Sequence, residues 1–192
     1  KTVTKLNTQQ MGIKIMMNAL YGAMGNKWFR YYDVRFAEAV TTSGQLAILW
    51  AEKTVNEYMN SLLGTDKVDY VIAIDTDSVY INFGPMVEQM GLTDKAQTVR
   101  VLDEIAEKKF VPIIEKSYQE LSDYMDSYEN KMVMGREVIA DVGVWTAKKR
   151  YILNVHNSEG VQYSTPKLKI MGIEAVKSST PASCRDALKG LF

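Results

Sequence analysis

The sequence predicts an α+β fold in which an antiparallel sheet packs on helices and a further helix comes first. Helical periodicity fills residues 8–24, 36–63 and 94–128, whereas β-rich runs separated by short turns fill residues 68–83 and 132–174. No internal repeat, low-complexity tract or Pro/Gly-rich linker divides the chain. We therefore expect one α+β unit.

The helices have recognisable ends. The first, at residues 8–24, is interrupted near Gly22 and Gly25. The second, at residues 36–63, is closed by Gly64, a common C-terminal cap. The third, at residues 94–128, is expected to bend at Pro112, and a final helix opens at Thr180–Pro181.

The strands begin with a hairpin. Residues 68–74 and 79–83 are β-rich and flank the turn Asp75-Thr76-Asp77-Ser78. Four further short strands are predicted at residues 132–140, 149–156, 160–163 and 168–174. Residues 157–160, NSEG, form the turn between two of them.

The composition is that of an ordinary globular protein. The 192 residues include 23 basic and 23 acidic side chains, 46% of residues are hydrophobic, and no apolar run approaches the roughly 20 residues of a membrane-spanning helix. Cys184 is the only cysteine, which excludes an internal disulfide and a cysteine-based zinc site. We expect a protein of a reducing, cytosolic compartment that does not enter membranes.

The zero net charge hides an asymmetry along the chain. Residues 1–36 carry a net charge of +5, residues 37–140 of −9, and residues 141–192 of +4. Cationic ends around an acidic centre suit a protein that binds a polyanion at its flanks and metal ions in the middle. The alternative is a solvated surface with unevenly distributed charge.

Asp75 and Asp77 are candidates for a metal site. Acids two positions apart in an extended segment point to the same side, and a hairpin tip projects them beyond the sheet. Mg²⁺ binds one or two carboxylates together with substrate phosphates, so this tip suits it. The alternative is that Asp and Ser are simply good turn formers.

The first helix divides into two faces. Lys14, Asn18, Tyr21 and Gly25 share one face, whereas an apolar arc predicted to face the core holds Ile13, Met16, Leu20, Ala23 and Met24. A cation, an amide and a phenol beside glycines would let a phosphate and a flat base approach. The alternative is an amphipathic helix with a wet polar face.

Two basic segments are candidates for nucleic-acid contact. In Lys148-Lys149-Arg150-Tyr151, strand alternation is expected to send Lys149 and Tyr151 to one face and Lys148 and Arg150 to the other; the alternative is a solvated basic turn. The block 28–32, WFRYY, suits stacking on bases, although core packing explains most such blocks. His156, the only histidine, is expected to be structural or at the surface, and a Ser-His-Asp hydrolase is not expected.

These motifs together resemble family B DNA polymerases. Residues 14–22, KIMMNALYG, are similar to the K-x-x-x-N-S-x-Y-G motif of the fingers helix, residues 75–78 to the D-T-D-S core of the palm hairpin, and residues 148–151 to the K-x-Y primer-side motif. The chain order and spacings also match. Residues 25–33, 55–58 and 167–172 look like the replicative polymerases of T-even-type bacteriophages, so the resemblance covers nearly the whole chain.

The resemblance implies a domain organisation and a role for each candidate residue. Residues 1–35 would be a fingers helix and the following turn, and residues 36–192 a palm. Asp77 would be the metal-binding catalytic carboxylate with Asp75 beside it, and Glu137 a further palm acid near two Mg²⁺ ions. The implied nucleotide-binding residues are Lys14, Asn18 and Tyr21; the implied DNA-binding residues are Gly22, Thr76, Lys148, Lys149, Arg150 and Tyr151.

The chain departs from the family pattern at Ala73-Ile74, where the family has Tyr-Gly, and at Ala19, where it has Ser. The family's D-x-x-S-L-Y-P motif, which carries the other catalytic aspartate, does not occur, nor do the exonuclease domain, most of the fingers and the thumb. We therefore expect this chain, which starts at Lys1, to be a cut fragment or one subunit of a split polymerase, inactive alone.

The implied partners are primer-template DNA, dNTP, a second polymerase chain or segment and a sliding clamp, in the cytoplasm of a bacterial host. Two other classes of function are alternatives. A catalytically inert nucleic-acid-binding palm would keep DNA binding without Asp75 and Asp77. A D-x-D glycosyltransferase would use the same acids, but it explains neither the Lys14 face nor the Lys148 cluster.

Overall fold

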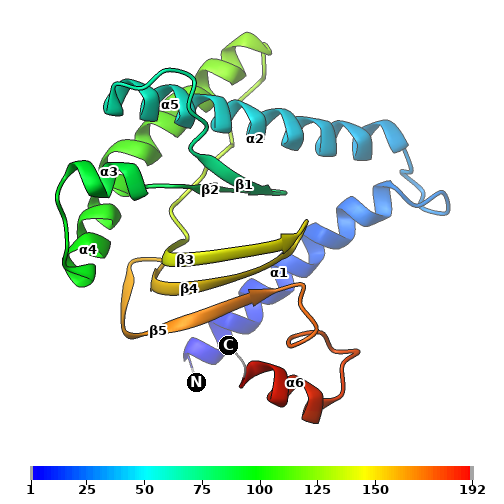
Figure 1. Cartoon of the computed structure of the whole chain (residues 1–192). Coiled ribbons are helices and arrows are strands. Elements are labelled where there is room, and N and C mark those ends of the chain that lie inside the picture. Colours follow the sequence, from blue (N-terminus) through cyan, green and yellow to red (C-terminus); the bar gives the residue numbers. More distant parts are fainter. Residues whose placement is uncertain (1, 191–192) are drawn as a thin grey trace. The chain divides into compact units, whose positions relative to one another are not determined.

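The computed structural model describes residues 2–190 and shows helices together with two antiparallel sheets, which confirms the α+β prediction (Figure 1). The chain divides between Leu49 and Trp50 into two compact units, here called the first and second unit. None of the helices among residues 2–190 combines the length and the apolar character needed to cross a bilayer.

The first unit contains α1 (Thr2–Met24), a loop and the first part of α2 (Val34–Leu63). The backbone N–H of Asp33 donates to the Met24 carbonyl at 3.2 Å, and the Asp33 side chain accepts from the Arg35 N–H at 3.0 Å at the start of α2. The α1 helix starts six residues earlier than predicted and continues through Gly22, because a single glycine weakens a helix without ending it.

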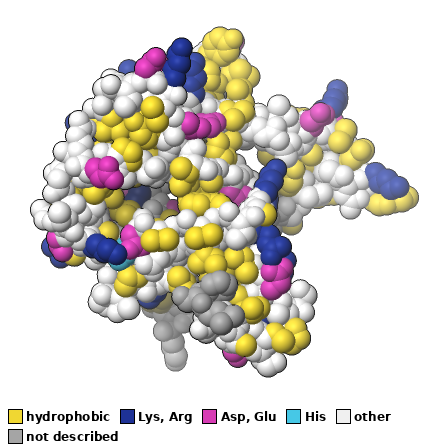
Figure 2. Space-filling view, in the orientation of Figure 1, with side chains coloured by type: hydrophobic (Ala, Val, Ile, Leu, Met, Phe, Trp, Pro, Cys, Tyr) yellow, Lys and Arg dark blue, Asp and Glu magenta, His cyan; other side chains and the backbone are white. Residues whose placement is uncertain are grey.

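The predicted core face of α1 is not buried. The structure reports no buried residue on α1, and Ile13, Met16 and Leu20 are each more than half exposed, so this prediction was wrong for them. Figure 2 shows hydrophobic side chains spread over the visible surface. Periodicity shows that a helix has an apolar face, but it does not identify what covers that face.

In the second unit, α2 supports the entry to the hairpin. Asn56 Oδ1 accepts from the Tyr70 N–H at 2.8 Å. Asn60 pairs with both backbone groups of Val68, at 3.0 Å through its oxygen and 2.8 Å through its nitrogen. The helix ends before Gly64, which has φ +66°, as predicted. These side chains fix where the first hairpin strand leaves the helix.

The helix predicted at residues 94–128 is interrupted by a π-helical turn. It consists of α4 (Lys95–Ile105), the π turn η1 (Ala106–Phe110) and α5 (Val111–Tyr124), and Asp94 caps its start. The prediction placed a bend at Pro112, and the π turn ends two residues before it, in the preceding turn, which the ring and missing N–H of a proline disturb. The short helix α3 (Gly84–Gln89) was not predicted.

The two sheets are a hairpin, β1 (Val71–Asp75) with β2 (Ser78–Ile81), and a three-stranded sheet in the order β3-β4-β5. The three strands are β3 (Val138–Ala147), β4 (Arg150–Ser158) and β5 (Val161–Met171). The sequence prediction started β3 six residues too early, at residue 132. It also divided β5 into two strands, at residues 160–163 and 168–174. Pro166 is tolerated inside β5 because β5 is an edge strand.

Strand β4 is central, and alternate residues on one of its faces are buried: Tyr151, Leu153, Val155 and Asn157. Helix α6 (Ala182–Lys189) follows Pro181, close to the predicted final helix.

A polar cluster joins the start of α4 to strands β3 and β4 of this sheet. Asp141 accepts hydrogen bonds from Lys95 Nζ at 2.9 Å and Asn154 Nδ2 at 2.8 Å. His156 Nε2 lies 3.2 Å from Asp141, although it is not aligned for a hydrogen bond. Burial alone would raise the pKa of Asp141, but these partners outweigh it and lower the pKa to about 2.

We predict that Asp141→Asn destabilises the chain by about 1 kcal/mol near neutral pH, a value reduced for solvent screening. The folded pKa of about 2 lies below the ordinary value of 3.8, so the contribution is complete above the latter and disappears as pH falls through the former. Urea unfolding of both proteins from about pH 6 to 2.5 measures it. A difference that stays constant over that range would contradict the prediction.

Candidate functional site

The predicted acids lie at the tip of the β1–β2 hairpin. Asp75 pairs with Ser78 in the ladder, and Thr76, with φ +55°, and Asp77 form the two-residue turn between them. The Asp75 carbonyl accepts from the Asp77 N–H at 2.6 Å and from the Ser78 hydroxyl at 3.1 Å. The predicted hairpin is confirmed, but the two acids are placed by a turn and not by strand alternation.

The two carboxylates have different surroundings. Asp75 is half-buried, and its Oδ1 accepts from the Thr76 hydroxyl at 3.2 Å. Asp77 is exposed, and no hydrogen bond or ion pair with another residue of the part described, 2–190, engages its carboxylate. Asp77 is thus open to a ligand from outside the chain.

The tip fits part of a magnesium site. Oxygen donors are what Mg²⁺ prefers, and one or two carboxylates with substrate phosphates and water are a usual ligand set. Among residues 2–190, however, no three His, Cys, Asp or Glu side chains gather closely enough to hold a metal ion. Any ligands beyond the carboxylates of the hairpin tip would therefore have to be substrate, water or residues of another segment.

Behind the tip, three aromatic rings connect the hairpin to the sheet. The ring of Tyr80, on β2, lies 5.4 Å from that of Trp145 and 5.4 Å from that of Tyr151, both edge-on. The Tyr80 hydroxyl donates to the Tyr151 hydroxyl at 2.7 Å. Tyr151 is buried with Leu153 and Val155, and Tyr80 and Trp145 pack against this core. The hairpin is thereby held against the start of β4.

The charges of two predicted acids affect the pKa of the Tyr151 hydroxyl. Burial raises the pKa of Tyr151 well above its ordinary value, and the charges of Asp75 and Glu137 act in the same direction. The charges of Asp75 and Glu137 thus act on the same hydroxyl. Tyr151 stays protonated at neutral pH and is a hydrogen-bond donor.

Glu137 precedes β3 and is engaged by other groups. Its side chain is about half exposed and forms an ion pair with Lys169 of β5, and its backbone carbonyl accepts from the Glu159 N–H at 2.8 Å. Arg136, nearly buried, forms an ion pair with Asp103 of α4. A metal-binding Glu137 would have to share its carboxylate with Lys169.

The basic segment is a hairpin turn. Strand β3 ends at Ala147 and β4 starts at Arg150, so Lys148 and Lys149 form the turn between them, and Lys149 has φ +61°. The predicted alternation therefore fails for Lys148 and Lys149, because β4 starts one residue later than predicted, but it applies to Arg150 and Tyr151. Lys148 and Lys149 are exposed, whereas Arg150 forms an ion pair with Glu174. The two lysines are better placed than Arg150 to contact phosphate.

The glycine that ends the segment 167–172 supports this turn. Gly172, just after β5, has φ +67°, and a Cβ there would lie 2.0 Å from the Lys149 carbonyl oxygen. Only glycine fits this approach. Its conformation is not visible from composition or spacing.

The nucleotide-side candidates lie in the first unit. Lys14, Asn18, Tyr21 and Gly22 are all exposed on α1, and a Cβ at Gly22 would meet no atom within 4 Å. The face is therefore open to a ligand. Exposure is expected both for a nucleotide-binding face and for the alternative, a solvated polar face of an amphipathic helix.

The aromatic and basic block 28–32 also lies at the surface. Trp28 is 84% exposed with the Lys27 ammonium 5.2 Å from its ring, and Tyr31 is 68% exposed with the Arg30 guanidinium at 5.5 Å. Core packing does not account for these two rings.

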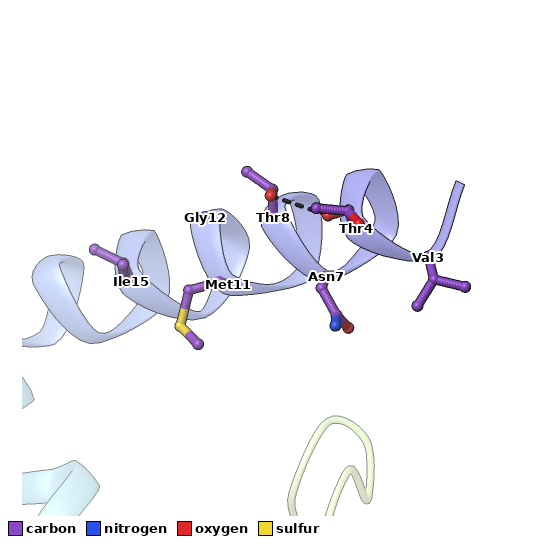
Figure 3. Close-up of a pocket in the computed structure, with 7 residues that line it drawn as sticks. All are labelled: Val3, Thr4, Asn7, Thr8, Met11, Gly12 and Ile15. Atoms are coloured by element: carbon purple, nitrogen blue, oxygen red, sulfur yellow. Dashed lines mark hydrogen bonds between the residues drawn. The ribbon is translucent and has the colours of Figure 1, made fainter. Parts of the chain in front are cut away.

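A shallow hollow on α1 is separate from all of these residues. Figure 3 shows its lining along one helix, where Gly12 lacks a side chain and the Thr8 hydroxyl donates to the Thr4 carbonyl at 3.0 Å. The lining contains no titratable side chain and none of the predicted site residues. It offers no chemistry of its own.

Comparison with known proteins agrees with this set of motifs. The model of "DNA polymerase family B" matches residues 1–180. A DNA-directed DNA polymerase of Escherichia phage RB69 is 44% identical over 95% of this chain, and that of Enterobacteria phage T4 is 42% identical over 98%. The DNA polymerase alpha catalytic subunit of Trypanosoma brucei brucei is 28% identical over 90%.

This chain belongs to DNA polymerase family B. Within the family it is similar to the polymerases of T-even-type phages over nearly its whole length, which confirms the resemblance seen in its motifs. The chain spans about a fifth of the two phage proteins, 21% and 22% of their lengths.

We predict that Gly172→Ala destabilises the chain by about 3 kcal/mol, because a methyl group collides with the Lys149 carbonyl and the backbone disfavours it. Gly160→Ala is the matched control. Gly160 also has a positive φ, +82°, but open space surrounds it, so only about 1 kcal/mol is expected. Urea unfolding measures both, and equal losses would show that the close approach to Lys149 does not matter.

Proposed function

We propose that this chain is the palm and one fingers helix of a phage replicative DNA polymerase, and that it contributes to transfer of a nucleotide from dNTP to a primer 3′ end. Residues 1–35 are the fingers helix with its turn, and residues 36–192 are the palm. The observation that carries the proposal is the exposed Asp77 carboxylate, which has no partner among residues 2–190 and lies on an anchored hairpin tip in a family B chain.

The two acids have different roles in this proposal. Asp77, exposed and without a partner among residues 2–190, is the metal-binding carboxylate. Asp75, whose carboxylate and carbonyl are both hydrogen-bonded within the turn, shapes the tip and adds negative charge. Mg²⁺ bound there would activate the primer hydroxyl and neutralise charge on the leaving pyrophosphate. Glu137 adds charge on the β3 side, shared with Lys169.

The remaining residues bind substrates. Lys14 carries the cation for the triphosphate, and Asn18, Tyr21 and Gly22 offer an open face to the nascent base pair. Lys148 and Lys149 contact the primer backbone from their exposed turn, whereas Tyr151, only 4% exposed, supports that turn from the core at the start of β4. Thr76, in the turn between the acids, lies near the primer end, and Arg150 supports the basic turn through Glu174.

A complete site needs a further carboxylate, because a two-metal reaction uses ligands beyond those gathered here. We propose that a second chain or segment with the D-x-x-S-L-Y-P motif supplies it, and that primer-template DNA, dNTP and a sliding clamp are the other partners in the bacterial cytoplasm. Primer extension then requires this chain together with that segment.

We predict that Asp77→Ala lowers primer extension by the assembled polymerase by about 10²- to 10³-fold, because a metal-binding carboxylate is worth several kcal/mol of barrier. Asp66→Ala is the control, since Asp66 is also an exposed acid in a turn. A gel assay of single-nucleotide addition measures the rates.

Two outcomes would contradict the assignment. Unchanged extension by the Asp77→Ala polymerase would show that Asp77 does not bind the catalytic metal. DNA binding without extension in every mixture with the partner segment would favour the inert nucleic-acid-binding palm.

We predict that Lys149→Ala weakens binding of the chain to primer-template DNA and reduces the slope of log K against log salt by about one, because one phosphate contact is lost. Lys67→Ala is the matched control, since Lys67 is another exposed lysine with a positive φ, 57°. Fluorescence anisotropy at several salt concentrations measures both. Equal effects of the two substitutions would mean that the basic turn makes no specific contact.

A further inference from the structure

Tyr80 links the two halves of the second unit's candidate site. Among residues 2–190, the bond from its hydroxyl to that of Tyr151, at 2.7 Å, is the only hydrogen bond reported between the β1–β2 hairpin and the β3-β4-β5 sheet. The motif comparison assigned no role to Tyr80. Its position in the structure suggests one.

The link lies close to both groups of functional residues. Tyr80 is two residues after Ser78, which pairs with Asp75 at the hairpin tip. Tyr151 is two residues after Lys149, in the turn that carries the exposed lysines. A displacement of either hydroxyl is therefore passed through at most two residues to the carboxylates or to the lysines.

The rings make the link stiff. Both tyrosine rings pack edge-on with each other at 5.4 Å, and Trp145, paired with Tyr151 across β3 and β4, closes the group at 5.4 and 6.2 Å. Aromatic groups of this kind have few alternative rotamers once buried. The hydroxyl pair thus has one favoured arrangement.

We propose that Tyr80 is a positioning residue, which holds the start of β4 through the Tyr151 hydroxyl and sets the separation between the hairpin tip and the Lys148–Lys149 turn. The proposal rests on the proposed polymerase function. It adds a residue that touches neither metal nor DNA and acts through Tyr151.

The test is Tyr80→Phe in the assembled polymerase, a change that keeps the ring and removes the hydroxyl. The rate of single-nucleotide addition at saturating dNTP should fall about 5-fold, as expected for one hydrogen bond. The KM for dNTP should change less than twofold, because the nucleotide-side residues are on α1. A changed KM with an unchanged rate would overturn the proposal.

A double-mutant cycle distinguishes positioning from general stability. Tyr151→Phe alone should lower the rate, and Tyr80→Phe should add nothing in that background, because Tyr80 acts through the Tyr151 hydroxyl. Additive losses would overturn the proposal.

Tyr70→Phe is the matched control. Tyr70 is 3% exposed, lies just before β1, and its hydroxyl is 2.9 Å from that of Thr65. Its loss should lower the melting temperature as much as Tyr80→Phe does while extension stays within twofold of wild type. An equal loss of extension would assign the Tyr80 effect to stability and overturn the proposal.

The two proposals fail in different ways. If the wild-type chain and its partner segment give no extension, the polymerase function fails and the role of Tyr80 with it. If wild type extends primers and Tyr80→Phe extends them equally fast, only the role of Tyr80 is overturned.

Discussion

The packing of Tyr80 against Trp145 and Tyr151 is the interaction on which the arrangement of the second unit depends. A two-stranded hairpin is marginally stable by itself, and this one carries two carboxylates at its tip. Asn56 and Asn60 hold its entry to α2, and Tyr80 holds its other strand to the buried face of β4. Acids can be exposed at the tip because the strands behind it are anchored at both sides.

The charged side chains also divide into those that form ion pairs and those that are exposed. The segment totals of +5, −9 and +4 count every acid and base alike. In the structure, Asp103, Glu137 and Glu174 pair with Arg136, Lys169 and Arg150. Asp77 and the lysines of the β3–β4 turn are exposed. Apart from Glu137, the ionic groups that support the sheet are therefore distinct from those offered to a ligand.

The exposed apolar face of α1 can be understood from the length of the relatives. The chain spans about a fifth of the phage polymerases it resembles, and α1 has no buried residue in the described structure. An amphipathic helix is stabilised mainly by burial of its apolar face. The exposed arc of α1 is consistent with the proposal that the working polymerase includes further polypeptide.

Much of the site was visible in the sequence. The hairpin was predicted because β-rich runs flank residues that favour turns, and the end of α2 was predicted because Gly64 readily adopts a positive φ. The exposed acids and lysines were found by residue type and chain order. These features depend on local conformational preference, which the residues themselves carry.

Other features required partners distant in the chain. The Tyr80–Tyr151 bond joins residues 71 positions apart, Gly172 is needed because Lys149 approaches it, and Glu137 is engaged by Lys169. Strand alternation misplaced both Asp77 and Lys149 because each lies in a two-residue turn, where alternation stops. The sequence by itself determined which local elements form and which groups they carry. Only the tertiary structure decided which of those groups meet and which stay exposed, because burial and pairing depend on neighbours that spacing along the chain does not specify.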